Sequence, residues 1–195
     1  MIVISIVVSL FVQLKMLSLQ LKNRRLPQHL LNRNWYYILS SGEMELTALN
    51  LPRYEVRLRG SQERPQIFDF LRRRYVALTP EEWVRQHFVH YLAEQLGYPP
   101  SLMANEVALQ MGEKRLRADT VIYTRTLQPL MIVEYKAPVV KITERVFEQA
   151  SAYNRLLRVP YIVVSNGLEH FCCCFNEQDC SYSFLREIPA FKDIF

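Results

Sequence analysis

Two short runs of consecutive apolar residues limit the fold of this chain more than any other feature. Residues 130–133 read LMIV and residues 161–164 read YIVV. A strand with one face in water alternates apolar and polar residues, whereas an unbroken apolar run is typical of a strand covered on both faces. Between the runs, residues 142–157 carry apolar side chains at helical spacing. The sequence therefore predicts a sheet whose buried strands are joined through a helix.

A second helix is predicted before these strands. Thr79 is a typical N-cap residue, Pro80 suits the first helical position, and acidic residues follow in the first turn. The helix should reach about residue 95 and stop at Gly97. Further strands are predicted over residues 54–58, 66–70, 106–111, 116–124, 171–175 and 182–185. This order predicts an α/β domain built in layers around a mixed central β-sheet flanked by helices.

The formal net charge of +5 is unevenly distributed along the 195 residues. Residues 1–43 hold five basic residues and one acid, a net of +4, so residues 44–195 carry only +1. We interpret residues 1–43 as an N-terminal extension outside the functional chain and residues 44–195 as the folded domain. The alternative is a membrane anchor over the apolar residues 1–14, but a spanning helix needs roughly 20 such residues. We therefore expect no membrane partner.

The four cysteines, Cys172, Cys173, Cys174 and Cys180, form no C-x-x-C pair. Their spacing does not suit the tetrahedral ligand set of a structural zinc site. We expect buried or half-buried reduced thiols, which are typical of a cytoplasmic protein.

Charged residues stand where two of the predicted strands should lie side by side. Glu134 and Lys136 end the first apolar run, and because they are two apart they point to the same face of their strand. Asp119 lies in the preceding strand, with fourteen residues between it and Glu134, which suits two antiparallel strands joined by a short turn. Solvated ion pairs would explain such residues equally well on an exposed strand. In a central strand, however, charges are costly unless they are paired or bind a metal.

The chemistry available to Asp119, Glu134 and Lys136 is specific. Two neighbouring carboxylates repel each other, and a hard divalent cation such as Mg²⁺, with Mn²⁺ as the alternative, relieves that repulsion. The metal would polarise a phosphoryl oxygen and lower the pKa of a bound water, while the lysine would orient that water. This set of residues therefore points to metal-assisted hydrolysis of a phosphodiester.

The same residues resemble a known active-site pattern. Asp119, a hairpin and then Glu134-Tyr135-Lys136 look like the signature of the PD-(D/E)XK nuclease superfamily, with Ala118 where proline is usual. Over residues 66–187 the chain is similar to the N-terminal nuclease domain of type I restriction enzyme R subunits. The resemblance implies a restriction-endonuclease-like three-layer fold and Mg²⁺-dependent endonuclease activity on DNA. It also implies restriction-modification or helicase subunits as partners.

Supporting residues follow from the resemblance. The carbonyl of Tyr135 would join the metal ligands, and a glutamate on the first helix would support the site. Helical geometry favours Glu81, because it lies nearer the apolar stripe than Glu82 does. In the alternative interpretation, both glutamates only stabilise the helix N-terminus. Gln149 and Tyr153 form a Q-x-x-x-Y motif on one helical face, which would position the DNA or the catalytic lysine.

Contacts to DNA are expected from the basic residues Arg117 and Lys141, and from the clusters at residues 72–74 and 114–115. For each of these, a solvated surface position is the alternative. The sequence has no G-x-x-x-x-G-K motif and hence no ATPase motor of its own. A second functional hypothesis therefore stays open, namely a nucleic-acid-binding or interaction module that keeps the fold without cutting.

Overall fold

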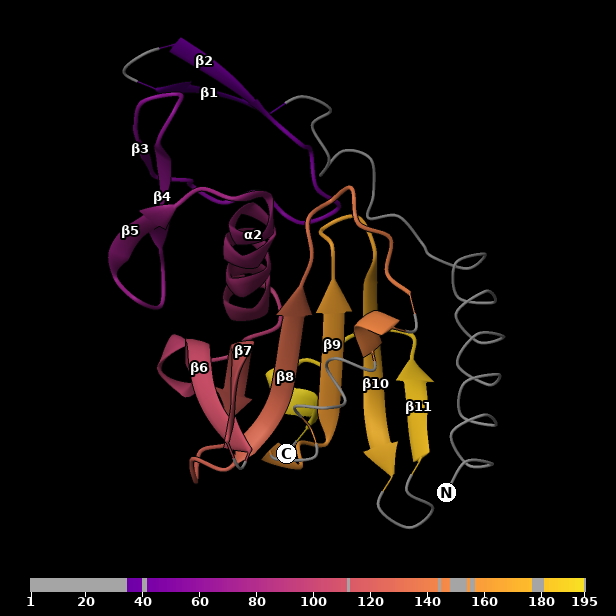
Figure 1. Ribbon diagram of the computed structural model, residues 1–195. Helices are drawn as coiled ribbons and strands as arrows, with labels where there is room; N and C mark the ends of the chain where they lie inside the picture. Colours follow the sequence, from indigo (N-terminus) through magenta and orange to yellow (C-terminus); the bar gives the residue numbers. More distant parts are fainter. Residues whose placement is uncertain are drawn as a thin grey trace.

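The computed structural model describes residues 35–39, 42–111, 113–143, 145–147, 154, 157–176 and 181–194. Its centre is a six-stranded sheet in the order β11-β10-β9-β8-β7-β6 (Figure 1). The strands are β6 (Met103–Met111), β7 (Lys114–Tyr123), β8 (Pro129–Tyr135), β9 (Tyr161–Ser165), β10 (His170–Asn176) and β11 (Ser181–Leu185). Neighbouring strands are antiparallel except β8 and β9, which are parallel. The predicted mixed sheet is therefore confirmed.

The two apolar runs form the parallel pair at the centre of this sheet. Met131 pairs with Tyr161 and Val133 with Val163. Parallel strands need a long crossover connection, and residues 145–147, 154 and 157 of that connection are helical. Both strands are paired on both edges and covered on both faces, which explains their unbroken apolar sequences.

Alternate residues of the central strands belong to two separate cores. Val133 and Val163 point to the face covered by α2 (Pro80–Glu94), where they pack with Val84 and Phe88. Ile132 points to the opposite face and belongs to a second core. The other members of that core include Val121, Ile142, Val146, Phe147, Ile162 and Val164. The domain thus has the predicted three layers, with the sheet in the middle.

Helix α2 begins and ends where its capping signals predict. The Thr79 hydroxyl accepts a hydrogen bond from the Glu82 N–H at 3.1 Å, and Pro80 occupies the first turn. The chain leaves the helix through Gly97, whose φ of +72° is the left-handed conformation that glycine adopts without strain. Two short 3₁₀ helices, Pro100–Leu102 and Phe191–Asp193, flank the first and last strands of this unit.

A small antiparallel sheet covers the side of α2 away from the central sheet (Figure 1). It is formed by β3 (Leu58–Gly60), β4 (Pro65–Asp69) and β5 (Arg74–Ala77), with β4 in the middle. The predicted strand over residues 54–58 was wrong except at Leu58, and β5 was not predicted. The apolar–polar alternation of residues 54–58 reflects an extended segment whose pairing starts only near its end.

A separate hairpin is formed by β1 (Trp35–Leu39) and β2 (Gly42–Leu46). It includes residues on both sides of the predicted boundary between positions 43 and 44. Whether residues 1–43 belong to the functional chain stays a prediction, and the apolar residues 1–14 lie outside the described residues. Within the described parts of the chain, no helix combines the length and the apolar character needed to cross a membrane.

Candidate active site

The hairpin of β7 and β8 brings the two predicted carboxylates together. Thr120 pairs with Val133, so Asp119 and Glu134 are the next positions along the two strands. The backbone N–H of Tyr135 donates to Asp119 Oδ2 at 2.9 Å. This bond fixes the Asp119 carboxylate against the end of β8. The spacing of fourteen residues therefore led to the correct neighbours.

Glu134 and Lys136 lie on one face, as their spacing predicts. Lys136 Nζ donates to Glu134 Oε1 at 3.0 Å, and the Lys136 backbone N–H is anchored on the Ser165 carbonyl at 2.9 Å. The Glu134 side chain is only 5 % exposed. Burial and the nearby Asp119 charge raise the pKa of Glu134 to about 7, although Lys136 opposes the shift. Asp119, Glu134 and Lys136 thus form one compact group.

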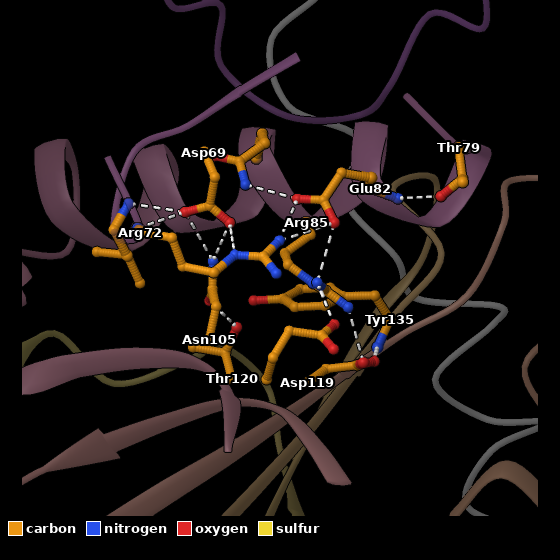
Figure 2. A network of polar contacts seen from close by, with 12 residues as sticks. Asp69, Arg72, Thr79, Glu82, Arg85, Asn105, Asp119, Thr120 and Tyr135 are labelled. Carbon is orange, nitrogen blue, oxygen red and sulfur yellow. Dashed lines mark hydrogen bonds and ion pairs between the residues drawn. The ribbon is translucent and has the colours of Figure 1, made fainter. Parts of the chain in front are cut away.

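Arg85, which the sequence did not single out, lies at the centre of the site (Figure 2). Its Nη2 donates to Asp119 Oδ1 at 2.8 Å, and its Nη1 contacts Glu82 Oε2 at 2.9 Å and a carboxylate oxygen of Glu106. Its guanidinium also lies over the Tyr135 ring, 5.7 Å from the ring centre. The side chain is 6 % exposed. Arg85 is therefore a fixed cation among three carboxylates, one of which belongs to the predicted catalytic set.

Glu106 reaches this cluster because β6 is irregular at that point. Asn105 pairs with Thr120 and Val107 with Ala118, so Glu106 lies opposite Asp119 in an unshifted register, but the regular pairing is interrupted at this position. Its φ of +60° is unusual for a residue other than glycine and departs from the regular strand backbone. Its second oxygen forms an ion pair with Arg117 Nη1 at 2.7 Å. No local pattern in the sequence signals this left-handed residue, and Glu106 was therefore missed.

The prediction that Glu81 rather than Glu82 faces the interior was wrong. Glu81 is exposed, whereas Glu82 is buried and contacts Arg85 and Gln86. Helical spacing alone predicts that only the apolar side of α2 is covered. The small sheet covers a second side of the helix, and Glu82 lies on that side, so Glu82 is buried as well.

A second polar network continues from Glu82 toward the small sheet (Figure 2). Arg72 bridges Asp69 and Glu82, and Asn105 Nδ2 donates to Asp69 Oδ2 at 3.0 Å. The Thr120 hydroxyl donates to Asn105 at 2.7 Å. The Arg72 side chain is thus engaged in the interior, contrary to its predicted role in contacting DNA.

Of the remaining predicted site residues, two lie within the described part of the chain and two lie outside it. Arg117 is 68 % exposed beside the cluster, and Lys141 is also exposed. Both are accessible to a DNA backbone. Gln149 and Tyr153 lie outside the described residues, so their placement stays a prediction.

The donor chemistry of the group suits a magnesium ion. Mg²⁺ is usually held by one or two carboxylates and keeps several of its waters. Asp119 and Glu134 supply two carboxylates, and the Tyr135 carbonyl is an oxygen donor of the right kind. No cluster of three or more His, Cys, Asp or Glu residues with metal-binding geometry occurs among the residues that the structure describes. An ion held by these residues would keep several of its waters.

A mixed sheet in three layers, with Asp119, Glu134 and Lys136 gathered on one hairpin, is the arrangement of the PD-(D/E)XK class. Residues 80–189, more than half of the chain, match the family described as Type I restriction enzyme R protein N terminus (HSDR_N). The chain belongs to this family. The matched region begins with α2 and includes every residue of the candidate site except Asp69 and Arg72.

A solved structure similar to this chain is a fragment of a putative HsdR subunit of a type I restriction enzyme from Vibrio vulnificus YJ016. The two share 19 % sequence identity with a TM-score of 0.44, over 60 % of this chain and 25 % of that one. This chain thus spans about a quarter of the length of that relative. No curated protein matches it.

Proposed function

We propose that this chain is a Mg²⁺-dependent DNA endonuclease domain that hydrolyses phosphodiester bonds in the cytoplasm. The observation that carries the proposal is that Asp119 is bonded to the end of β8 at Tyr135, the residue between the paired Glu134 and Lys136. Two carboxylates and a lysine at one point of a sheet are the groups that metal-assisted hydrolysis needs. Mn²⁺ is expected to substitute for Mg²⁺.

Each residue has a definite part in the proposed reaction. Bound Mg²⁺ would polarise the scissile phosphate and acidify a water molecule. Asp119 would hold the ion, and its carboxylate is oriented by hydrogen bonds from the Tyr135 N–H and from Arg85. Glu134 would be the second carboxylate ligand, and its raised pKa means that bound metal must displace a proton near neutral pH. Lys136 would orient the attacking water and stabilise negative charge on the phosphoryl oxygens.

The proposal extends to partners. The family is named for one end of an R subunit. The 195 residues contain no P-loop sequence, so they supply no ATP-driven movement on DNA themselves. Restriction-modification or helicase subunits are the proposed partners.

A plasmid assay tests this proposal. Wild-type protein with Mg²⁺ or Mn²⁺ should relax or linearise supercoiled plasmid, and EDTA should stop the reaction. Asp119→Ala and Lys136→Ala should each cut at least 100-fold more slowly, because each removes a group needed to stabilise the transition state. Glu113→Ala, an exposed residue in the turn after β6, is the matched control and should cut like wild type. Cutting that persists in both Asp119→Ala and Lys136→Ala would remove the assigned site.

A non-cleaving DNA-binding module is the second candidate function, and one observation favours it. Arg85 already supplies a positive charge to Asp119, so part of the site is electrostatically balanced without a metal. Such a module would bind DNA, show no cleavage with either metal, and gain no thermal stability from Mg²⁺. This combination of results would favour the module over the nuclease.

A further inference from the structure

The small sheet has an outer face of unusual composition. Leu58, Ile67 and Val76 face inward and pack with the main core. The alternate positions face away from the core. Arg59 pairs with Gln66 across the first two strands, and Phe68 pairs with Tyr75 across the second and third. Arginine and aromatic residues therefore share the face of β3–β4–β5 that points away from the protein.

The arginines of this face lie on the aromatic rings. The Arg59 guanidinium carbon is 4.0 Å from the centre of the Tyr75 ring, and its Nε donates to Gln66 Oε1 at 2.8 Å. Arg57 lies over Phe68 at 5.6 Å, and the Phe68 and Tyr75 rings meet edge to face at 5.3 Å. A guanidinium is planar, so one that lies over a ring can offer its other flat side to a second planar group.

Positive charge is concentrated in the same segment. Residues 57–77 contain six arginines, Glu63 and Asp69, a net of +4. Residues 44–195 carry +1 in total, so the rest of that region carries −3. Arg57 and Arg59 are exposed, and in the described part of the chain neither forms an ion pair with an acidic side chain. This distribution of charge is complementary to a polyanion.

A groove continues the face toward α2. Its volume is about 210 Å³, and its lining combines the aromatic and basic residues Tyr54, Arg57, Phe68, Phe70, Arg73 and His90 with the acidic Glu55 and Glu94, of which Glu94 is paired with His90. The Arg73 guanidinium lies over the Phe70 ring at 5.4 Å. The groove is smaller than the roughly 300–1,000 Å³ of small-molecule sites. A single planar ring lined by aromatic groups suits this space better than an extended ligand does.

We propose that the outer face of β3–β4–β5 binds single-stranded nucleic acid. Arg57, Arg59 and Arg73 contact phosphates, and unstacked bases lie on the arginine–aromatic pairs and in the adjoining groove. Stacking on aromatic and guanidinium planes is the usual means by which proteins hold single strands without reading sequence. The inference deepens the proposed function. It rests on that function in one respect, which is that the face holds the nucleic-acid strand for cleavage at the Asp119 site.

Binding is measured by fluorescence anisotropy in EDTA, with a labelled 20-nucleotide oligo(dT) and a duplex of the same length. The single strand should bind more tightly than the duplex. Arg57→Gln/Arg59→Gln should weaken binding at least 10-fold and reduce the salt slope by about 1.4, because each lost phosphate contact lowers that slope by about 0.7. Tyr75→Leu should weaken binding roughly 5- to 150-fold, and Tyr75→Phe should restore it, because only the leucine lacks a ring for stacking.

Arg125→Gln is the matched control, because Arg125 is also exposed and also lies over an aromatic ring, that of Phe191. It should bind the single strand like wild type. Circular dichroism and thermal melting identify any variant that fails to fold, and Tyr75→Phe keeps the test valid if Tyr75→Leu does not fold.

Three results would overturn the inference. Equal binding of duplex and single strand, with Tyr75→Leu unaffected, would indicate simple contact with duplex phosphates. Loss of binding in Arg125→Gln to the same extent as in Arg57→Gln/Arg59→Gln would indicate a general charge effect. No binding of either nucleic acid would indicate another kind of partner, such as an acidic protein surface. Because EDTA prevents metal-dependent cleavage, failure here is distinct from failure of the plasmid assay.

Discussion

At the residue scale, Arg85 explains why three largely buried carboxylates can lie close together beside α2. Glu82, Glu106 and Asp119 all contact its guanidinium, and none of the three is more than 19 % exposed. Buried charges of one sign are costly, and a single cation placed between them offsets most of that cost. Arg85 is thus a structural requirement of the site whether or not a metal is bound.

Replacing Arg85 with methionine keeps the length of the side chain and removes the charge. We expect Arg85→Met to lose about 3 kcal/mol of stability in EDTA, because three carboxylates are left without their common partner. Millimolar Mg²⁺ should restore part of the loss, since a divalent cation offsets the same charges. Urea unfolding with and without Mg²⁺ measures both effects. Arg115→Met, at an exposed position, is the control and should change stability by less than about 0.5 kcal/mol.

His87 makes the fold sensitive to mild acid. It is buried in α2, its Nδ1 donates to the Trp83 carbonyl at 2.9 Å, and burial lowers its pKa from 6.5 to about 4. The unfolded chain therefore binds a proton more readily than the folded protein does. Its contribution to stability is full above pH 6.5 and is lost as the pH falls toward 4, by about 3 kcal/mol in all.

Chemical unfolding at pH values between 7 and 4 tests this behaviour in wild type and in His87→Phe. The variant should show a shallower decline over this window, even if the lost hydrogen bond lowers its stability at pH 7. His170, whose pKa is also lowered by burial, leaves some acid sensitivity in both proteins. An identical decline in wild type and His87→Phe would show that another group is responsible.

At the scale of elements, α2 is unlike a helix on the surface of a sheet. Its apolar residues Val84 and Phe88 face the central sheet, as their spacing predicts. Its polar residue Gln86 is also fully buried, and Gln86 accepts a hydrogen bond from the Phe70 N–H at 3.0 Å. The small sheet makes this second contact. A helix lying between two sheets buries polar residues that would otherwise be in water, and each then needs a partner.

The turn between β9 and β10 fits tightly against α2 through Gly167. Its φ is +81°, and a Cβ atom there would lie 2.7 Å from Leu49 Cδ2 and 3.1 Å from Val84 Cγ2. Gly97 has a similar φ of +72°, but a Cβ atom on it would meet nothing within 4 Å. An alanine at Gly97 would therefore suffer backbone strain alone, whereas an alanine at Gly167 would suffer backbone strain and steric overlap.

We expect Gly97→Ala to cost roughly 1–2 kcal/mol, the cost of a left-handed backbone for a residue with a Cβ. Gly167→Ala should cost about 1–3 kcal/mol more, because Leu49 and Val84 are buried and have little room to move. Urea unfolding of the two variants beside wild type measures the difference. Equal losses would mean that the turn moves away from α2 without cost.

At the scale of the whole molecule, the proposed metal binding would be linked to stability. A ligand that binds only the folded protein stabilises it by about 2.7 kcal/mol when its concentration is 100 times its dissociation constant. If Asp119 and Glu134 bind Mg²⁺, thermal unfolding of wild type should shift upward with increasing Mg²⁺. This measurement needs no DNA and no catalytic activity.

Asp119→Ala should abolish most of that shift, whereas Glu113→Ala should retain it. Substitution of KCl for MgCl₂ at equal ionic strength separates specific binding from screening. An equal shift in wild type and Asp119→Ala would place the metal elsewhere on the molecule.

The sequence by itself determined the central strands, the capped helix α2 and the grouping of Asp119, Glu134 and Lys136. These features depend on local periodicity, capping and hairpin spacing, which act between residues close in the chain. Only the tertiary structure decided that Glu82 and not Glu81 is buried, and that Arg85 and Glu106 join the site. It also decided that β5 completes an arginine-rich face. Each of these depends on which element covers a given side of another, or on the left-handed backbone of Glu106, and neither is a function of local spacing.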